Sequence, residues 1–312
     1  MIRTFAVAGD AGGITHDPAT GLTHHTPPPQ ETSRQQIDDA ALSRWPVISS
    51  ADIARVRPVS LCWSPIVRCN LPCRHCLDDT TVTEARKQAR VVIAGVLANA
   101  GILGIDISGG EPLLLRDLPD LARRITAGGT TAVSVTTNGW HLKRRAGELA
   151  ETVDAIRVSL DGPTPAIHDS HRARGSFTRA CAGIRAAVDT GLPVQVQFVL
   201  MHANQDHLQA MVDLAADLGA GGLTVLQMLP IGAGAALADI EMLSDDTAEQ
   251  LVDALEEPDG FRLRLRRRGA DAGGFTVVRA DGRVWRNDPA GHAITSLHLL
   301  SSPADLNHEV AR

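Results

Sequence analysis

The sequence predicts an α/β fold in which a parallel β-sheet is covered by helices. Strand-like and helix-like segments alternate six times between residues 58 and 232. Strands that alternate with helices imply a parallel sheet whose crossover connections are right-handed. The length of 312 residues allows one large domain with modest additions on either side of it.

Hydrophobic alternation places the strands. Residues 193–200 give the clearest example, because their side chains alternate with the period of two that a strand requires. The six strands are expected at residues 59–63, 104–108, 132–137, 155–160, 193–200 and 223–227. Helices are expected between them, at residues 84–100, 117–127, 141–152, 177–190 and 205–218.

The segment before residue 58 shows little hydrophobic periodicity. Its stretch Thr23–Pro29 ends in three consecutive prolines, which favour extended or polyproline-like backbone over helix. Without a partner motif, His24 and His25 are interpreted as part of a solvated loop. We therefore expect residues 1–57 to form an extension that lies over the main domain or is partly disordered.

The pattern changes again after residue 232, so residues 58–232 and 233–312 are expected to be separate regions. Ser244, followed by acidic residues, predicts a helix start. Residues 261–266 predict a strand, and residues 275–285 predict a hairpin that turns at Asp281-Gly282. Arginines at 262, 264, 266, 267 and 268 indicate either an edge strand protected by charge or a contact with an anionic substrate.

Composition and charge exclude several classes of protein. The net charge of −6 argues against a nucleic-acid or acidic-membrane binder. There is no apolar run of about 18 to 20 residues, so no membrane span is expected. The first ten residues lack the apolar core of a signal peptide. We therefore expect a cytoplasmic protein, in a compartment where thiols stay reduced; the oligomeric state is left open.

The most informative motif is Cys69-Asn-Leu-Pro-Cys73-Arg-His-Cys76. Three thiols in so short a loop cannot form a disulfide framework. Cysteine thiolates hold iron–sulfur clusters, and four ligands are the norm for a [4Fe–4S] cluster. Three ligands leave one iron open for chemistry or substrate binding. The alternative is a zinc site with His75 or a remote residue as fourth ligand, although zinc ligands more often come in pairs and no second pair exists here.

This cysteine motif resembles the signature of the radical S-adenosylmethionine (radical SAM) enzymes. The resemblance implies a partial (β/α)6 TIM-like barrel, with the N-terminal extension and a small α+β C-terminal region attached to it. It also implies that the open iron binds SAM, and that an electron from the cluster cleaves SAM to a 5′-deoxyadenosyl radical. In such barrels the active residues gather at the C-terminal ends of the strands.

Gly109-Gly110-Glu111-Pro112 directly follows the second expected strand. Two glycines let backbone approach a ligand closely, and Glu111 offers an acceptor for an ammonium group. The matching segment of the radical SAM family binds the SAM amino group. The resemblance also places five further residues at the SAM pocket, namely Thr137, Asn138, Ser159, Arg172 and Met228. Alternation along the fifth expected strand adds Gln197, which could face substrate or adenosine.

Several of these residues have an alternative interpretation. Ser159 and Arg172 are candidates for the SAM carboxylate and ribose, but Arg172 could instead form a surface ion pair with Asp169. Asp161 either contacts substrate or caps a turn. Gln195 and Gln197 point the same way along their strand, toward substrate or into a polar core layer. Met228 contacts adenine or belongs to the core.

The run from Ser159 to Asn204 resembles the peptide-cyclising and quinone-cofactor members of the family, and the C-terminal region resembles the SPASM type. SPASM regions normally carry cysteines for auxiliary clusters, but no cysteine follows Cys181. One [4Fe–4S] cluster is therefore expected, together with an electron donor such as flavodoxin or ferredoxin.

The expected function is hydrogen abstraction from a small molecule in natural-product biosynthesis. Residues 1–57 are too short and too poorly patterned for a leader-peptide-binding domain. A single cluster favours a redox-neutral outcome, such as decarboxylation, elimination or epimerisation. The alternatives are a peptide-modifying enzyme that uses a separate leader-binding partner, and a non-catalytic iron–sulfur binding or sensor protein.

Overall fold

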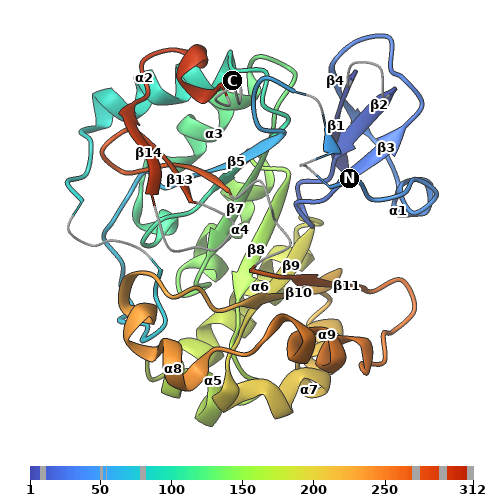
Figure 1. The fold of residues 1–312 in the computed structure, drawn as a ribbon, viewed down its shortest axis with the longest axis vertical. Coiled ribbons are helices and arrows are strands. Elements are labelled where there is room, and N and C mark those ends of the chain that lie inside the picture. Colours follow the sequence, from blue (N-terminus) through green and yellow to red (C-terminus); the bar gives the residue numbers. More distant parts are fainter. Residues whose placement is uncertain are drawn as a thin grey trace.

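Two β-sheets organise the chain (Figure 1): a ten-stranded sheet and a four-stranded antiparallel sheet near the N-terminus. The computed structural model describes residues 1–7, 12–49, 52–53, 55–77, 82–268, 275–287 and 294–307. None of the helices in these ranges has the length and hydropathy to cross a bilayer.

The six expected strands are present, and each boundary lies within one residue of the expected one. They are β5 (Ser60–Trp63), β6 (Gly104–Ile107), β7 (Ala132–Thr137), β8 (Ala155–Ser159), β9 (Val194–Leu200) and β10 (Gly222–Gln227). Each pairs in parallel with the next. The partial-barrel prediction is thereby confirmed.

The expected helices are present too, with ends that shift by up to three residues. They are α2 (Lys87–Ala98), α3 (Leu118–Thr126), α4 (Leu142–Ala150), α6 (Ser176–Asp189) and α7 (Leu208–Asp217). A short helix, α5 (Pro165–His171), was not expected, although Pro165 at its first turn is a known start signal. Two single-turn helices also occur, α1 (Asp39–Leu42) and α8 (Ala238–Glu241).

The strands of the barrel separate a hydrophobic layer from a polar interior. Ile105 and Ile107 of β6 belong to the buried core under the helices. Because side chains alternate along a strand, the intervening Asp106 faces the inner side of the barrel. There its carboxylate accepts hydrogen bonds from Ser134 and Thr136 of β7, both at 2.8 Å. The interior surface is therefore polar, and we refer to it below as the lumen.

The N-terminal segment is an ordered sheet, which corrects the expected loose extension. Its strands are β1 (Ile2–Val7), β2 (Gly13–His16), β3 (Thr23–Thr26) and β4 (Ser33–Gln36), in the order β3-β2-β1-β4. Thr23–Thr26 is thus a strand and not polyproline-like. His24 is buried, with Nδ1 2.9 Å from the carbonyl oxygen of Trp45, and is not part of a solvated loop.

This sheet closes the N-terminal end of the barrel. The turn between β2 and β3 presents its carbonyl groups to two arginines of the lumen. Arg157 of β8 donates to Ala19 and Pro18 at 3.0 and 2.7 Å. Arg264 donates to Thr20 at 2.6 Å. Arg157 also pairs with Asp106 inside the lumen at 3.0 Å. The closed end of the lumen, which we call its floor, is therefore connected to the polar side chains that form its wall.

A buried ion-pair network fastens the sheet to the barrel. Asp17 and Arg3 have fully buried side chains and form an ion pair at 3.4 Å. Asp17 also accepts hydrogen bonds from Arg262 and Thr20, both at 2.8 Å. Although burial opposes ionisation, the two guanidinium groups lower the pKa of Asp17 below its ordinary value. Arg262 is therefore part of this junction, whereas the sequence indicated either a charge that protects an edge strand or a contact with an anionic substrate.

The C-terminal region adds strands to both edges of the barrel sheet. β11 (Arg262–Arg266) pairs in parallel with β10, and β12 (Thr276–Val278) pairs in parallel with β5. β13 (Arg283–Asn287) and β14 (Ile294–Leu299) continue the sheet in antiparallel orientation. The expected hairpin is confirmed by the bond from Gly282 N to Arg279 O at 2.9 Å. The domain boundaries at residues 57 and 232 stay predictions.

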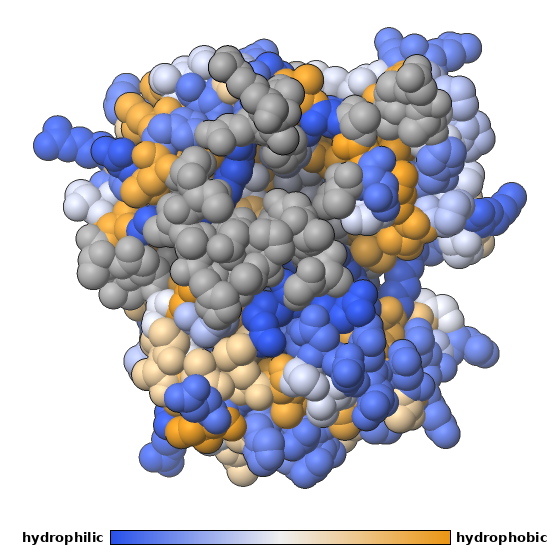
Figure 2. Space-filling view, in the orientation of Figure 1, coloured by the Kyte–Doolittle hydropathy of each residue, from blue (hydrophilic) through white to orange (hydrophobic). Residues whose placement is uncertain are grey.

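The expected helix after Ser244 is α9 (Asp245–Asp253). The Ser244 hydroxyl accepts from Thr247 N at 3.1 Å, as an N-cap does. In Figure 1, α7 and α9 lie below β11, and Figure 2 shows mostly hydrophilic residues over that part of the molecule.

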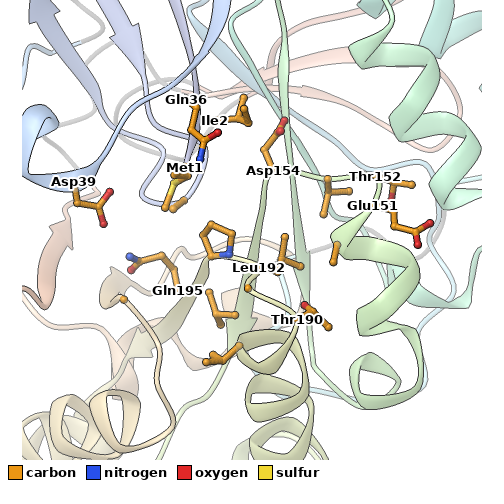
Figure 3. A pocket seen from close by; sticks show the side chains of 18 of the residues that line it. Met1, Ile2, Gln36, Asp39, Glu151, Thr152, Asp154, Thr190, Leu192 and Gln195 are labelled. Carbon is orange, nitrogen blue, oxygen red and sulfur yellow. The ribbon is translucent and has the colours of Figure 1, made fainter.

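A groove of about 850 Å³ lies between the N-terminal sheet and the loops that lead into the barrel strands (Figure 3). Gln36 and Asp39 line it on one side, and Glu151, Asp154 and Leu192 on the other. Gln195 also lines this groove, so its side chain belongs to the N-terminal end of β9. Gln197, two residues further along, lies nearer the C-terminal end.

Replacing Asp17 by Asn should lower the free energy of unfolding by about 3–5 kcal/mol, because the buried Arg3 and the half-buried Arg262 would keep only the exposed carboxylate of Asp39. Urea unfolding followed by circular dichroism measures this change. Glu31→Gln, at an exposed carboxylate of the same segment, should change the stability by less than about 0.5 kcal/mol.

The effect of Asp17→Asn should also depend on pH. Because the folded-state pKa of Asp17 lies below the ordinary 3.8, its contribution is present above pH 3.8 and is lost as the pH falls through the folded value. The two proteins should therefore converge in acid. Equal stability of the two proteins at neutral pH would contradict this role for Asp17.

Candidate functional site

The cysteine loop follows β5 at the C-terminal end of the barrel strands. Within it, the Cys69 residue is exposed, whereas Cys73 and Cys76 are half-buried. The carboxylate of Glu84 anchors the start of the loop by accepting from Val67 N and Arg68 N at 2.9 and 2.8 Å. The loop backbone is thus held on one side before its first cysteine.

A pair of glycines holds the other side of the cysteine loop. Gly110 N donates to Ile66 O at 2.8 Å, and a Cβ at position 110 would lie only 2.2 Å from Val67 O. Gly109 has a positive φ of 111°, and a Cβ there would lie 2.4 Å from Ile66 O. The sequence predicts close approach to a ligand at these glycines. In the structure, the group that approaches them is the backbone of the cysteine loop.

Glu111 ties neighbouring strand ends together. Its side chain is fully buried, and Oε1 accepts from Thr137 Oγ1 and Leu113 N at 2.7 and 2.9 Å. Oε2 accepts from Asn138 N at 2.9 Å. Burial raises the pKa of Glu111, and the hydrogen bonds from Asn138 and Thr137 act against this rise. Pro112 begins the buried 3-10 turn Pro112–Leu114 that follows.

Asn138 connects the end of β7 to the cysteine loop. Its Nδ2 donates to Asn70 Oδ1 at 3.0 Å and lies 3.8 Å from Cys69 Sγ. Its Oδ1 accepts from Trp140 N at 2.9 Å, which fixes the orientation of the amide. Asn138 therefore lies against the first cysteine.

Arg172 is buried and lies between a carboxylate and the second cysteine. Its Nε donates to Asp161 Oδ2 at 2.5 Å, and its Nη1 lies 3.9 Å from Cys73 Sγ. The alternative of a surface pair with Asp169 is wrong, because Asp169 instead accepts from Gly175 N and Phe177 N at the start of α6. No sequence pattern indicated the Asp161–Arg172 pair, since a helix separates the two residues.

The remaining residues of the expected SAM pocket belong to β8 and β9 or directly follow β10. Ser159 and Gln197 are half-buried and face each other in the register of β8 and β9. Met228 is buried directly after β10. Asp106 and Arg157, which form the polar wall and floor of the lumen, were not singled out from the sequence. Their alternation with buried hydrophobic residues was the available signal.

A second segment covers the last cysteine. Ala233 N and Gly234 N both donate to Cys76 O, at 2.8 and 3.3 Å. They belong to the 3-10 turn Gly232–Leu237, which leads into α8. The alanines of this turn are exposed, and Figure 2 shows a weakly hydrophobic area there, toward the lower left.

Two of the three thiols have raised pKa values. Burial raises the pKa of Cys73 to about 11, against the opposing effect of Arg172. Burial also raises the pKa of Cys69. A thiol with a raised pKa is a poor nucleophile, whereas a metal ion deprotonates the thiol that binds it. The site therefore suits metal binding better than cysteine nucleophile chemistry.

Two features of the thiols are compatible with a cluster. Within the described residues, no three His, Cys, Asp or Glu side chains gather closely enough to hold a single metal ion. In an iron–sulfur cluster each thiolate binds a different iron, so the thiols stand farther apart. Cys69 and Cys73 also have amide or guanidinium donors near their sulfurs, as ligating thiolates do.

Comparison with known proteins agrees with this geometry. The model of the Radical SAM superfamily matches residues 63–215. This superfamily uses a [4Fe–4S] cluster and SAM. The matched residues begin at the end of β5 and extend into α7, so they include the cysteine loop, Gly109–Pro112, Asn138 and Arg172.

Curated relatives include two probable GTP 3′,8-cyclases. One, from Metallosphaera sedula, is 30% identical over 172 residues, which cover 53% of this chain and 54% of the relative. Another, from Saccharolobus islandicus, is 32% identical over 171 residues, which cover 53% of this chain and 56% of the relative. The chain thus spans about half the length of the curated relatives it matches.

Two solved structures share the fold. Streptococcus suis SuiB bound to the precursor peptide SuiA has a TM-score of 0.63 at 13% identity, with 91% of this chain and 81% of that chain covered. Native anSMEcpe with bound AdoMet has a TM-score of 0.54 at 18% identity, with 74% of each chain covered. At such identities the likeness concerns the fold alone.

Gly110→Ala should displace the cysteine loop, because the new Cβ would overlap Val67 O. We expect the variant to retain less than half of the wild-type iron and sulfide after anaerobic reconstitution. Gly147→Ala in α4 is the control, since a Cβ there meets no atom within 4 Å and alanine favours helix. Equal iron content in Gly110→Ala and wild type would contradict the proposed packing.

The cysteine spacing, the glycine pair under the loop and the barrel all agree with the family match over residues 63–215. On these observations, the chain belongs to the radical SAM superfamily.

Proposed function

We propose that this protein is an enzyme that abstracts a hydrogen atom from a small molecule and gives a redox-neutral product. When bound, the cluster and SAM supply a 5′-deoxyadenosyl radical. The observation that carries the proposal is the convergence of the three cysteines, Asn138 and Arg172 over a polar lumen. A protein that only stored a cluster would have no need of such a lumen.

In this proposal, three groups of residues have separate roles. Cys69, Cys73 and Cys76 hold three irons and leave the fourth open to SAM. The backbone of Gly109 and Gly110 fixes the loop that carries these thiols. The residues proposed to line the SAM pocket are Glu111, Pro112, Thr137, Asn138, Ser159, Arg172, Gln197 and Met228.

The lumen supports a small, polar substrate. Alternation along β5, β7 and β9 directs Cys62, Thr136 and Gln197 to the inner side, where hydroxyl, thiol and amide groups can bind a hydroxylated molecule. The N-terminal sheet closes the floor through Arg157, so substrate would enter from the cysteine end. Since relatives are named probable GTP 3′,8-cyclases, nucleotides are the first substrates to test.

One feature of the sequence and one of the structure support a redox-neutral reaction on a small molecule that is not part of a peptide. No cysteine follows Cys181, so an auxiliary cluster that could accept an electron has no cysteine ligands in the C-terminal region. Strands β1 to β4 form a sheet that is engaged with the barrel through Asp17 and Arg34, the latter paired with Asp154 at 2.5 Å. That engagement leaves less of the sheet available for a leader peptide.

The proposal includes a flavodoxin or ferredoxin as electron donor and a cytoplasmic location, without nucleic-acid or membrane partners. A peptide-modifying enzyme with a separate leader-binding protein is the alternative within the same chemistry. Turnover that requires both a peptide and the leader-binding protein would distinguish this alternative from the proposed function.

Anaerobically reconstituted wild type, given dithionite and SAM, should form 5′-deoxyadenosine, which mass spectrometry quantifies. Cys73→Ala should form less than about 1% of that amount, because one iron would lose its ligand. Cys181→Ala, at a buried cysteine of α6, is the matched control and should retain the activity.

Stimulation of deoxyadenosine formation by GTP or another nucleotide would support the small-molecule assignment. Stimulation only by a peptide would replace it with the alternative. A fully loaded cluster that forms no deoxyadenosine, with or without these additions, would contradict the proposal and favour a binding or sensor protein.

A further inference from the structure

Arg172 joins a buried carboxylate to a cysteine of the loop. Its Nε donates to Asp161 Oδ2 at 2.5 Å, and its Nη1 lies 3.9 Å from Cys73 Sγ. The Arg172 side chain is only 8% exposed and that of Asp161 is fully buried. Because a guanidinium group is planar and carries five donors, it can serve two acceptors in fixed directions.

Asp161 is held rigidly enough to orient its partner. Its Oδ1 accepts from Val199 N of β9 at 3.1 Å. Its backbone N donates to His168 Nδ1 at 3.1 Å, and its backbone O accepts from Asn204 Nδ2 at 3.2 Å. Although burial alone would raise the pKa of Asp161, Arg172 and His75 hold it well below its usual range. The residue is therefore a fixed anion.

The same carboxylate also reaches the cysteine loop directly. His75, which lies between Cys73 and Cys76, donates from Nε2 to Asp161 Oδ2 at 3.2 Å. Its ring is buried, and Nδ1 has no hydrogen-bond partner among the described residues. One oxygen of Asp161 thus fixes both the loop and the guanidinium group that faces it.

We propose that Asp161 is a positioning residue that directs the Arg172 guanidinium at the Cys73 sulfur, and that this contact raises the reduction potential of the cluster. The inference rests on the proposed function, in which Cys73 binds an iron. Reduction adds one electron, supplied in the experiment by dithionite, and no bond forms or breaks. A positive donor at a ligating sulfur stabilises the added negative charge.

This role differs from the SAM contact that the family resemblance suggests for Arg172, and the two are compatible. A contact with SAM acts only when SAM is present, whereas the contact with Cys73 acts without it. The reduction potential of the SAM-free protein therefore separates the two roles.

The test compares three variants by redox titration monitored by electron paramagnetic resonance, without SAM. Arg172→Gln removes the charge, and Arg172→Lys keeps the charge but cannot reach Asp161 and Cys73 with two fixed nitrogens. Arg174→Gln is the control, at an exposed arginine nearby. We expect more negative potentials for both Arg172 variants, with the larger shift in Arg172→Gln, and the wild-type potential for Arg174→Gln.

An unchanged potential in Arg172→Gln would overturn the contact with Cys73. A wild-type potential in Arg172→Lys would show that charge alone matters, which would overturn the positioning role of Asp161. Iron, sulfide and circular dichroism measurements on each protein show whether the variant is folded and loaded. Failure of the wild type to hold a cluster would instead contradict the proposed function.

Discussion

The close approach between two backbone segments is the constraint on which the site depends. Gly109 and Gly110 leave no side chain between the end of β6 and residues 66–68, so the cysteine loop rests directly on the barrel. Glu111 then ties this junction to the end of β7 through Thr137 and Asn138. The thiols are consequently placed by the sheet itself and not by a free loop, which is the rigidity that a cluster site requires.

The opposite end of the barrel is closed by a different kind of interaction. The charges of Arg3 and Asp17 in the N-terminal sheet pair with Arg262 of β11, which is far away in sequence. Arg157 in turn pairs with Asp106 inside the lumen. The desolvation of these groups is offset only while all of them are paired. The residues at the closed end of the lumen and those that line it therefore form one network, which supports the proposal that substrate enters at the cysteine end.

The barrel could be predicted from the sequence, because polar and apolar side chains alternate along much of each strand and the cysteine and glycine motifs fall at strand ends. The N-terminal sheet could not, since its strands are as short as four residues and are stabilised by Arg157, Arg262 and Leu103, which lie far away in the chain. The cysteines, Gly110 and Asn138 follow strand ends, as their positions in the sequence predict, and their roles in binding a cluster or SAM stay predictions. The Asp161–Arg172 pair could not be predicted, because the contact depends on how α5, which lies between the two residues, directs the chain back toward Asp161.

Electron paramagnetic resonance of the reduced protein, before and after addition of SAM, tests the central claim most directly. Three cysteine ligands and one open iron predict a [4Fe–4S] signal, with four irons per chain, whose shape changes when SAM binds. A signal that SAM leaves unchanged would contradict the open iron. Zinc in place of iron would contradict the account of the cysteine loop altogether.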